Sequence, residues 1–336
     1  MQKLLSTYDE LTQTFHTSER VLFVHGKSLE RFTQLKEYLH SLHKTYNHFT
    51  NFTANPKLDD AKLATETFSA NACDYILAVG GGSAIDTAKY VKLKHPEAKL
   101  AVIPTTAGSG SEATRFAVLY EDGKKLSLTD NIMIPDYVLF DPELLKYLPE
   151  YHRKSSALDA FSHALESFWS VNANDESKHF SREALSRITR LLEDYPASYD
   201  PESMLQSAYV AGKAINLAQT TAGHAMCYKI TGLFGTAHGH SAALCNRVLF
   251  QWLINNSSLP VLNDIARAMG CDSPTLAAEK FGAIFSRMGL AVPEASPQDI
   301  EALSSSVNPE RLKNFPASLD THTITKLYRQ ILRVKE

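Results

Sequence analysis

The sequence lacks most of the features that would place it in a specialised class of protein. It has only four cysteines in 336 residues, at positions 73, 227, 245 and 271, and no two of them have CxxC spacing. This argues against a disulfide framework and against a zinc knuckle. No run of residues is apolar enough to span a bilayer, and the first residues lack the apolar core of a signal peptide. We therefore expect a cytoplasmic protein without a membrane partner.

The chain also lacks an excess of charge of either sign. It carries 34 Lys and Arg against 37 Asp and Glu, which gives a formal net charge of −3. A chain balanced in this way offers no electrostatic case for binding nucleic acid or an anionic membrane, so the expected partner is a small molecule. A second copy of the chain, in a homodimer, is the other partner considered, although the sequence does not determine the number of subunits.

Strand signals are confined to the first part of the chain. Short apolar runs such as Arg20–Val24 and Tyr75–Val79 alternate with helical patterns, and Asp122-Gly123 marks a hairpin turn. Beyond Asp141-Pro142 only helical periodicity remains. We therefore expect an α/β nucleotide-binding domain over residues 1–149 with a largely parallel sheet, and an all-helical domain over residues 150–336. A cleft between the two is the expected place for a site.

Two glycine-rich turns follow strand-like segments in the first half, although the first of them is not a GxGxxG fingerprint. Gly80–Ser83 follows Tyr75–Val79 and opens a helix, so its N–H groups and the helix dipole are suited to a phosphate. A tight turn without a ligand is the alternative. Pro104–Glu112 follows Leu100–Ile103 and holds four hydroxyls and two glycines. Hydroxyls and bare backbone suit a ribose and a nicotinamide.

The second half concentrates histidine around short turns. The stretch from Thr220 to His240, TTAGHAMCYKITGLFGTAHGH, contains three of the 13 histidines. Upstream, Asp159 and His163 stand four residues apart beside an apolar helical stripe, where the alternative is a weak surface pair. Together with His224 and His238 they make a set of one carboxylate and three imidazoles. Such a set suits Fe²⁺ or Zn²⁺ and leaves room for a substrate oxygen.

Five segments, in the order of a known family, resemble the iron-dependent (group III) alcohol dehydrogenases. They are GGGSAIDTAK at Gly80–Lys89, PTTAGSGSEAT at Pro104–Thr114, DPELLKYLP at Asp141–Pro149, ALDAFSHALES at Ala157–Ser167, and the HA…AHG stretch at His224–Gly239. The resemblance implies a dehydroquinate synthase-like fold and an NAD(P)-dependent, metal-containing oxidoreductase acting on CH–OH donors.

The same resemblance implies roles for individual residues. The metal would be held by Asp159, His163, His224 and His238. Cofactor contacts would come from Asn55, Gly81, Gly82, Ser83, Thr105, Thr106 and Lys125, to which we add the hydroxyl of Ser109.

Within the family, the sequence looks most like the phosphonoacetaldehyde reductases, also called 2-hydroxyethylphosphonate dehydrogenases. It departs from many members at Tyr228, where they have a second histidine. A phenol with a pKa near ~10 mainly donates a hydrogen bond, so the proton would come from water or a hydroxyl relay. We take Tyr228 and His240 as the candidate catalytic side chains.

The turn after the first predicted strand bears on the choice of nucleotide. Gly26 stands where an acidic residue can bind the adenosine ribose, and it is followed by Lys27 and Ser28. The absent carboxylate and the added charge favour NADP(H) over NAD(H), whereas the alternative is an ordinary turn into a helix capped by Ser28.

An anionic substrate would need a cationic partner. Arg115 is the first candidate, beside Phe116, and Lys229 and Arg247 are the others. The expected function is that of a metal-dependent NAD(P)H aldehyde reductase. The alternatives are a dehydrogenase of another short-chain alcohol or polyol, a dehydroquinate-synthase type of reaction, and a nucleotide-binding protein without turnover.

Overall fold

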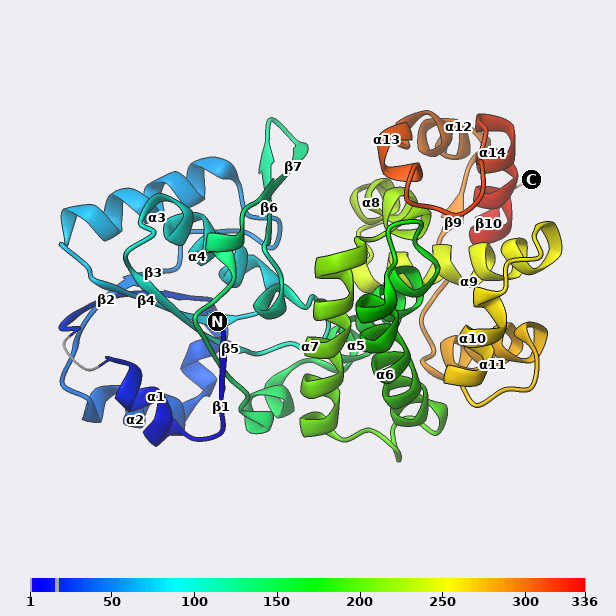
Figure 1. Cartoon of the computed structure of the whole chain (residues 1–336). Helices are drawn as coiled ribbons and strands as arrows, with labels where there is room; N and C mark the ends of the chain where they lie inside the picture. Colours follow the sequence, from blue (N-terminus) through cyan, green and yellow to red (C-terminus); the bar gives the residue numbers. More distant parts are fainter. Residues whose placement is uncertain (1, 16–17, 336) are drawn as a thin grey trace. The chain divides into compact units, whose positions relative to one another are not determined.

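The computed structural model describes residues 2–15 and 18–335, which form two compact units (Figure 1). One ends at Leu148 and the other begins at Pro149. The first is an α/β unit and the second is helical, so the predicted fold class is confirmed.

The first unit is built on a six-stranded sheet whose strands pair only in parallel, in the order β1-β8-β5-β4-β2-β3. The sequence patterns do not reveal β1, which has three residues, or β3, which is mostly polar and lies at an edge. The strands are β1 (Lys3–Leu5), β2 (Arg20–His25), β3 (Thr45–Phe49), β4 (Tyr75–Gly80), β5 (Lys99–Pro104) and β8 (Tyr137–Leu139).

Helices cover both faces of this sheet, because successive residues of a strand point to opposite sides. In β2, Phe23 packs in the same cluster as α1 (Tyr8–Phe15) and α2 (Thr33–Ser41). Its neighbour Leu22 packs with α3 (Leu58–Ala70) and α4 (Gly82–Lys94) on the other side (Figure 1).

The predicted hairpin joins β6 (Phe116–Glu121) to β7 (Lys124–Thr129) in antiparallel register. Both turn residues have positive φ, 49° at Asp122 and 72° at Gly123. This is the conformation for which an Asp-Gly pair is favoured in two-residue hairpins.

The strand order reverses beside the glycine-rich turns. The chain runs from β2 outward to β3 and then returns to the other side of β2 as β4, so the order reverses between β2 and β4. Ligands of open parallel sheets bind at the carboxyl ends of strands on either side of such a reversal. In this unit those ends lead into Gly26 and Gly81.

The second unit is organised around α5, whose carboxyl-terminal two-thirds is fully buried. This helix packs against α6, α7 and α9, and it buries Phe161, Phe168 and Trp169 almost completely. The helices are α5 (Glu150–Trp169), α6 (Asp175–Glu193), α7 (Pro201–Ala218), α8 (Ala222–Phe234), α9 (His238–Asn256), α10 (Val261–Ala268), α11 (Pro274–Arg287), α12 (Pro297–Ser306), α13 (Pro309–Leu312) and α14 (Thr321–Ile331).

One detail corrects the prediction that this unit is wholly helical. Two strands of two residues each, β9 (Glu294–Ala295) and β10 (Arg333–Val334), pair in parallel. The sequence does not predict them, because two residues cannot show the period-2 alternation of a strand.

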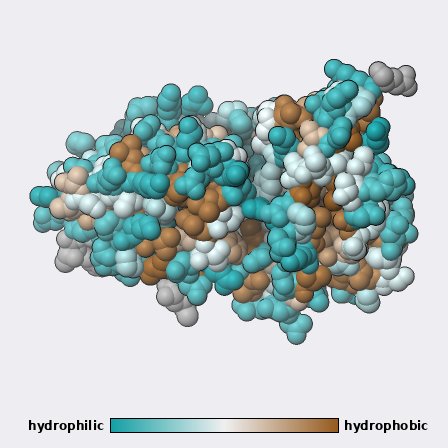
Figure 2. Space-filling model, turned by 90° about the horizontal axis from the view of Figure 1, so that it is seen from above, coloured by the Kyte–Doolittle hydropathy of each residue, from teal (hydrophilic) through white to brown (hydrophobic). Residues whose placement is uncertain are grey.

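On the face seen in Figure 2, hydrophobic side chains lie in separate groups among hydrophilic ones on each unit. Among the residues that the structure describes, none of the helices combines the length and the apolar character needed to span a membrane.

Candidate functional site

Helix α5 places a carboxylate and an imidazole one turn apart in the buried centre of the second unit. Asp159 and His163 are 7% and 5% exposed, so neither is the surface pair that the spacing alone would allow. Nε2 of His163 lies 3.9 Å from Oδ1 of Asp159. A charge buried this deeply requires a compensating partner.

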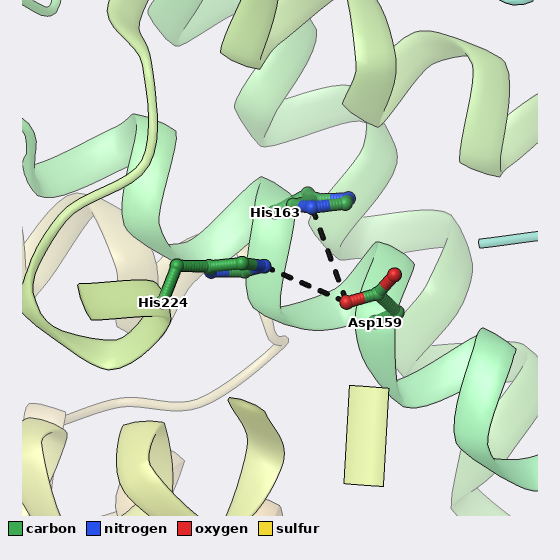
Figure 3. Close-up of side chains that lie close together, drawn as sticks. All are labelled: Asp159, His163 and His224. Atoms are coloured by element: carbon green, nitrogen blue, oxygen red, sulfur yellow. Dashed lines mark ion pairs between the residues drawn. The ribbon is translucent and has the colours of Figure 1, made fainter. Parts of the chain in front are cut away.

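Helix α8 brings His224 to the same carboxylate oxygen (Figure 3). Its Nε2 lies 3.5 Å from Oδ1 of Asp159, and its ring stacks on that of His163 with centroids 4.6 Å apart and planes 16° apart. One oxygen or nitrogen from each of the three residues lies within 4.8 Å of the other two. This is the spacing of groups that share a cation.

The fourth predicted ligand approaches from the start of α9. Nε2 of His238 lies 4.0 Å from Oδ1 of Asp159. The next residue must be glycine, because a Cβ at Gly239 would lie 2.2 Å from the carbonyl oxygen of Ser155 and 2.5 Å from Cβ of Asp159. This close approach of α9 to α5 brings His238 next to the other candidate ligands.

A buried carboxylate that sequence reasoning missed fixes the orientation of His224. Glu166, two turns after Asp159 on α5, is fully buried, and its Oε1 lies 2.5 Å from Nδ1 of His224. Asn246 donates to the same oxygen at 2.7 Å, and Thr221 donates to Oε2 from its N at 2.5 Å and its Oγ1 at 2.7 Å. With Nδ1 engaged, Nε2 is the nitrogen of His224 that faces Asp159.

His238 is oriented in a similar way by a thiol. Sγ of the buried Cys227 lies 3.6 Å from Nδ1 of His238, which leaves Nε2 towards Asp159. The spacing of Cys227 and His238 in the sequence does not predict this contact, because the contact depends on the turn between α8 and α9.

The imidazoles that surround Asp159 and Glu166 lower the pKa values of these two carboxyl groups. Burial raises the pKa of Asp159, but the imidazoles of His163, His238 and His224 outweigh it and leave that pKa well below its usual value. Burial likewise raises the pKa of Glu166, and the charge and hydrogen bond of His224 together with the Asn246 and Thr221 donors lower it to about 2. Both carboxylates are therefore anionic at neutral pH.

The donor set fits a divalent transition metal. Oδ1 of Asp159 and Nε2 of His224 are both buried and have no hydrogen-bond partner among the described residues, although each faces the other ligands. Buried polar atoms that converge in this way are typical of side chains that can share a cation. Three imidazoles and one carboxylate suit Fe²⁺ or Zn²⁺.

The other predicted residues of this unit are placed differently. The ring of Tyr228 stacks on His238 with centroids 5.4 Å apart and planes 15° apart. His240 is buried against Tyr151, with Nδ1 3.2 Å from the phenol oxygen, and burial lowers its pKa. Lys229 is exposed.

Arg247 lies further along α9 than the candidate ligand His238. Nine residues separate them, which is about 13 Å along a helix axis. Its guanidinium carbon lies 5.3 Å from the ring centre of Phe285, which His240 also contacts. His240 and Arg247 therefore share an aromatic contact.

In the first unit, the two glycine-rich turns pack against each other. A Cβ at Gly81 would lie 3.0 Å from Oγ1 of Thr106, and one at Gly82 would lie 3.1 Å from Cβ of Ser109. Gly81 caps α4, and its backbone and that of Gly82 are partly exposed. The predicted phosphate turn and the predicted hydroxyl turn thus form one surface at the carboxyl end of β4.

Four more predicted cofactor residues lie beside this surface. Oγ of Ser83 donates to the carbonyl of Ala54 at 2.6 Å, which ties the turn to the segment that holds Asn55. The following Pro56 accepts a hydrogen bond from Tyr120 at 2.9 Å, and Tyr120 is paired across the hairpin with Lys125. Thr105 is buried and continues from β5.

A buried charged network, also missed from the sequence, holds the hydroxyl turn in place. Asp86 on α4 accepts from Oγ of Ser111 and, at 2.9 Å, from N of Val118. Lys89, which is 0% exposed, donates to Oγ1 of Thr114 at 3.0 Å. Burial lowers the pKa of Lys89 to about 8, although the charges of Asp86 and Glu112 oppose that shift. The Asp and Lys of GGGSAIDTAK thus support the second turn.

The remaining predicted residues of this unit lie at its surface or its hairpin. Lys27 and Ser28 are exposed, directly after the end of β2. Arg115 is partly buried, and its guanidinium carbon lies 5.6 Å from the ring centre of the next residue, Phe116. Both precede or begin β6.

Comparison with known proteins places the chain in a family. The model of the iron-containing alcohol dehydrogenases matches residues 3–142, and the model of the C-terminal part of that family matches residues 154–332. The chain belongs to the iron-containing alcohol dehydrogenase family. It is therefore an oxidoreductase acting on CH–OH groups, which confirms the resemblance noted in the sequence.

Two relatives illustrate how widely the family varies. The chain is 29% identical over 274 residues to aldehyde-alcohol dehydrogenase 2 of Entamoeba histolytica, and it spans only 31% of that protein's length. It is 27% identical over 324 residues to the phosphonoacetaldehyde reductase of Streptomyces viridochromogenes, with 83% of this chain and 81% of that protein covered.

Solved structures show the same fold. The sulfoacetaldehyde reductase of Bifidobacterium kashiwanohense, solved with NAD⁺, has a TM-score of 0.89 at 22% identity over 98% of this chain and 96% of that one. A 1,3-propanediol oxidoreductase has a TM-score of 0.86 at 23% identity, with 99% of this chain and 98% of that chain covered. At these identities the likeness establishes the fold alone.

Proposed function

We propose that this protein is a metal-dependent NADPH aldehyde reductase, and that its substrates are short aldehydes carrying an anionic group such as phosphonoacetaldehyde. The observation that carries the proposal is the convergence of His163, His224 and His238 on one oxygen of the buried Asp159, which has no hydrogen-bond partner among the described residues.

Asp159, His163, His224 and His238 would hold the ion. A divalent ion there would act as a Lewis acid that polarises a carbonyl and stabilises the charge that develops as hydride arrives. The protein's own contribution is preorganisation. Glu166 fixes the tautomer of His224, and the packing of Gly239 on Asp159 sets the position of His238.

The surface formed by the two turns of the first unit would hold the nucleotide. Gly81 and Gly82 are partly exposed and their N–H groups are suited to the phosphates, and Thr106 and Ser109 offer hydroxyls beside them. Asn55 and Lys125 adjoin this surface through the contacts of Ser83 and Pro56.

The end of β2 favours NADPH. Gly26 offers no carboxylate to repel a 2′-phosphate, and Lys27 and Ser28 are exposed beside it. The nearest acidic side chain in the following turn, Glu30, is paired with Lys36 at 3.0 Å. A phosphate at this position would therefore meet one available cation and a hydroxyl.

Two similar proteins support an anionic aldehyde. One is a phosphonoacetaldehyde reductase, and the other is a sulfoacetaldehyde reductase. Both names describe a two-carbon aldehyde with a strongly acidic group. Dehydrogenation of a neutral short-chain alcohol or polyol is the second candidate, which the 1,3-propanediol oxidoreductase fold supports.

Absorbance at 340 nm tests the proposal directly. The protein is loaded with Zn²⁺ or Fe²⁺ and supplied with NADPH and either phosphonoacetaldehyde or propanal. Oxidation of NADPH should be lost when a chelator removes the metal and should return when the metal is restored. A loaded protein that oxidises neither NADPH nor NADH with any short aldehyde would instead be a nucleotide-binding protein without turnover.

A further inference from the structure

We propose that Arg311, on the short helix α13, is the cation that recognises the anionic group of the substrate. The inference rests on the proposed function and names a residue for it. Arg311 lies with its guanidinium carbon 5.0 Å from the ring centre of Tyr228, whose ring stacks on the candidate ligand His238 at 5.4 Å. The guanidinium carbon is therefore at most 10.4 Å from the ring centre of His238, the sum of those two separations.

In the stack of His238, Tyr228 and Arg311, the tyrosine ring holds the guanidinium. The histidine that other family members have at this position is less suited to that role. A neutral phenol ring attracts a cation over its face, by about 0.5–1 kcal/mol at an exposed site. An imidazole at the same place could be protonated and would then repel both a metal and a guanidinium. Tyr228 is thus suited to hold an arginine beside the metal site.

Contacts on both sides fix the segment that carries Arg311. Asn308 caps α13 by accepting from N of Glu310 at 2.9 Å. On the other side, Nδ2 of Asn314 donates to Oε1 of Gln219 at 3.0 Å, and Phe315 is 4% exposed, with its ring edge-on to Trp169 at 6.1 Å.

The contacts of Asn314 and Phe315 connect this segment to the turn that precedes α8. Thr221, directly before α8, accepts from Nε1 of Trp169 and donates to Glu166, the carboxylate that orients His224. The segment of Arg311 is therefore anchored to the same turn that positions the metal ligands. A guanidinium held in this way loses little side-chain entropy on binding an anion.

The alternatives in this unit are placed less favourably. Lys229 follows Tyr228 on the helix and is exposed. The guanidinium of Arg247 lies against Phe285, whereas that of Arg311 lies against Tyr228, whose ring stacks on the candidate ligand His238. An arginine also presents two parallel N–H groups to a phosphonate or sulfonate, which a lysine cannot do.

Steady-state kinetics of the metal-loaded chain with phosphonoacetaldehyde, sulfoacetaldehyde and propanal test this assignment. Arg311→Ala should raise KM for the two anions by about 10- to 100-fold, because each loses charge-assisted hydrogen bonds, and the effect on propanal should be at least tenfold smaller. Arg311→Lys should give an intermediate loss. Arg267→Ala, which removes an exposed arginine of α10 in the same unit, is the matched control and should match the wild type.

Equilibrium binding separates recognition from chemistry. Titration calorimetry with 2-hydroxyethylphosphonate should show the same 10- to 100-fold weakening in Arg311→Ala, while its metal content stays at the wild-type level. An equal loss for anionic and neutral aldehydes, or a selective loss in Arg115→Ala instead of Arg311→Ala, would overturn the assignment of Arg311. A wild-type enzyme that reduces propanal but not the anions would also overturn it and leave the aldehyde reductase standing. Failure with every aldehyde would instead refute the proposed function.

Discussion

Each unit of the molecule buries a glutamate, and the two are held in opposite ways. Glu166, in the second unit, receives hydrogen bonds at both oxygens from Asn246, Thr221 and His224, and its pKa falls to about 2. Glu112, in the first unit, is 1% exposed, and its Oε1 has no hydrogen-bond partner among the described residues. Burial raises the pKa of Glu112 to about 7, against the opposing effects of a backbone hydrogen bond and Lys89.

The difference shows what a buried carboxylate requires in order to stay ionised and orient a neighbouring side chain. A carboxylate with donors at both oxygens is a permanent anion and can orient a metal ligand. A carboxylate without them costs stability whenever it is ionised. The candidate ligands of the second unit are therefore held in place for a cation, whereas the network of Asp86, Lys89 and Glu112 supports the two glycine-rich turns at an energetic cost.

The largest expected effect comes from removing the carboxylate at the centre of the second unit. Asp159→Ala should lower kcat/KM for aldehyde reduction by about 1000-fold or more, because Lewis-acid stabilisation worth several kcal/mol is lost with the ion. Steady-state kinetics after metal loading measure it. Retention of more than a tenth of the activity would contradict the claim that the buried carboxylate of the second unit, unlike that of the first, holds a catalytic ion.

A smaller effect is expected from Glu166→Gln, which keeps the shape of the side chain but not its charge. The amide would face the donors of Thr221 or Asn246 with its own N–H groups, so His224 would be held less firmly. We expect metal affinity to weaken by about 10- to 100-fold, measured by competition with a chromophoric chelator. An unchanged affinity would show that His224 needs no such anchor.

In the first unit, by contrast, replacing the buried glutamate should be favourable: Glu112→Gln should stabilise the folded protein. A group whose folded pKa is raised contributes stability below its unfolded pKa and loses it as the pH rises through the folded value, here from about 4.5 to about 7. The variant should therefore be more stable than the wild type at pH 8, by on the order of 1–3 kcal/mol, and the gain should shrink towards zero near pH 4.5.

Thermal melts of both proteins at the two pH values measure this difference. Glu66→Gln, which changes an exposed carboxyl on α3, is the control and should stay within about 0.5 kcal/mol of the wild type at each pH. A Glu112→Gln variant that is less stable than the wild type at pH 8 would mean that Glu112 has a partner when ionised.

The smallest expected effect concerns nucleotide choice. We expect kcat/KM to be higher with NADPH than with NADH, and Lys27→Ala to raise KM for NADPH by about 5- to 10-fold while KM for NADH changes less than twofold. Lys44→Ala, which removes a partly exposed charge elsewhere in this unit, serves as the control. Equal or better turnover of NADH by the wild type would refute the preference.

Sequence reasoning reached the elements with strong periodicity and the side chains with distinctive chemistry. It predicted the long apolar strand β4 and the hairpin at Asp122-Gly123, because burial on both faces and turn chemistry leave local signals. It also selected four residues, Asp159, His163, His224 and His238, that the structure brings together. Short or polar edge strands such as β1 left no comparable signal.

The supporting residues were beyond its reach. Glu166 acts through partners 55, 58 and 80 positions away in the chain, and no local pattern encodes such contacts. Arg311 lies 83 positions after Tyr228, with which it forms a cation–π contact. Such pairings are set by how helices pack, which a single sequence does not reveal.

Metal stoichiometry tests the central claim most directly. The chain is loaded with Zn²⁺, dialysed, and analysed by inductively coupled plasma mass spectrometry beside His224→Ala and His179→Ala, the second of which alters an exposed histidine of α6. The account predicts one ion per chain in the wild type and in His179→Ala, and less than about a tenth of an ion in His224→Ala. Full occupancy in His224→Ala, or no bound ion in the wild type, would contradict it.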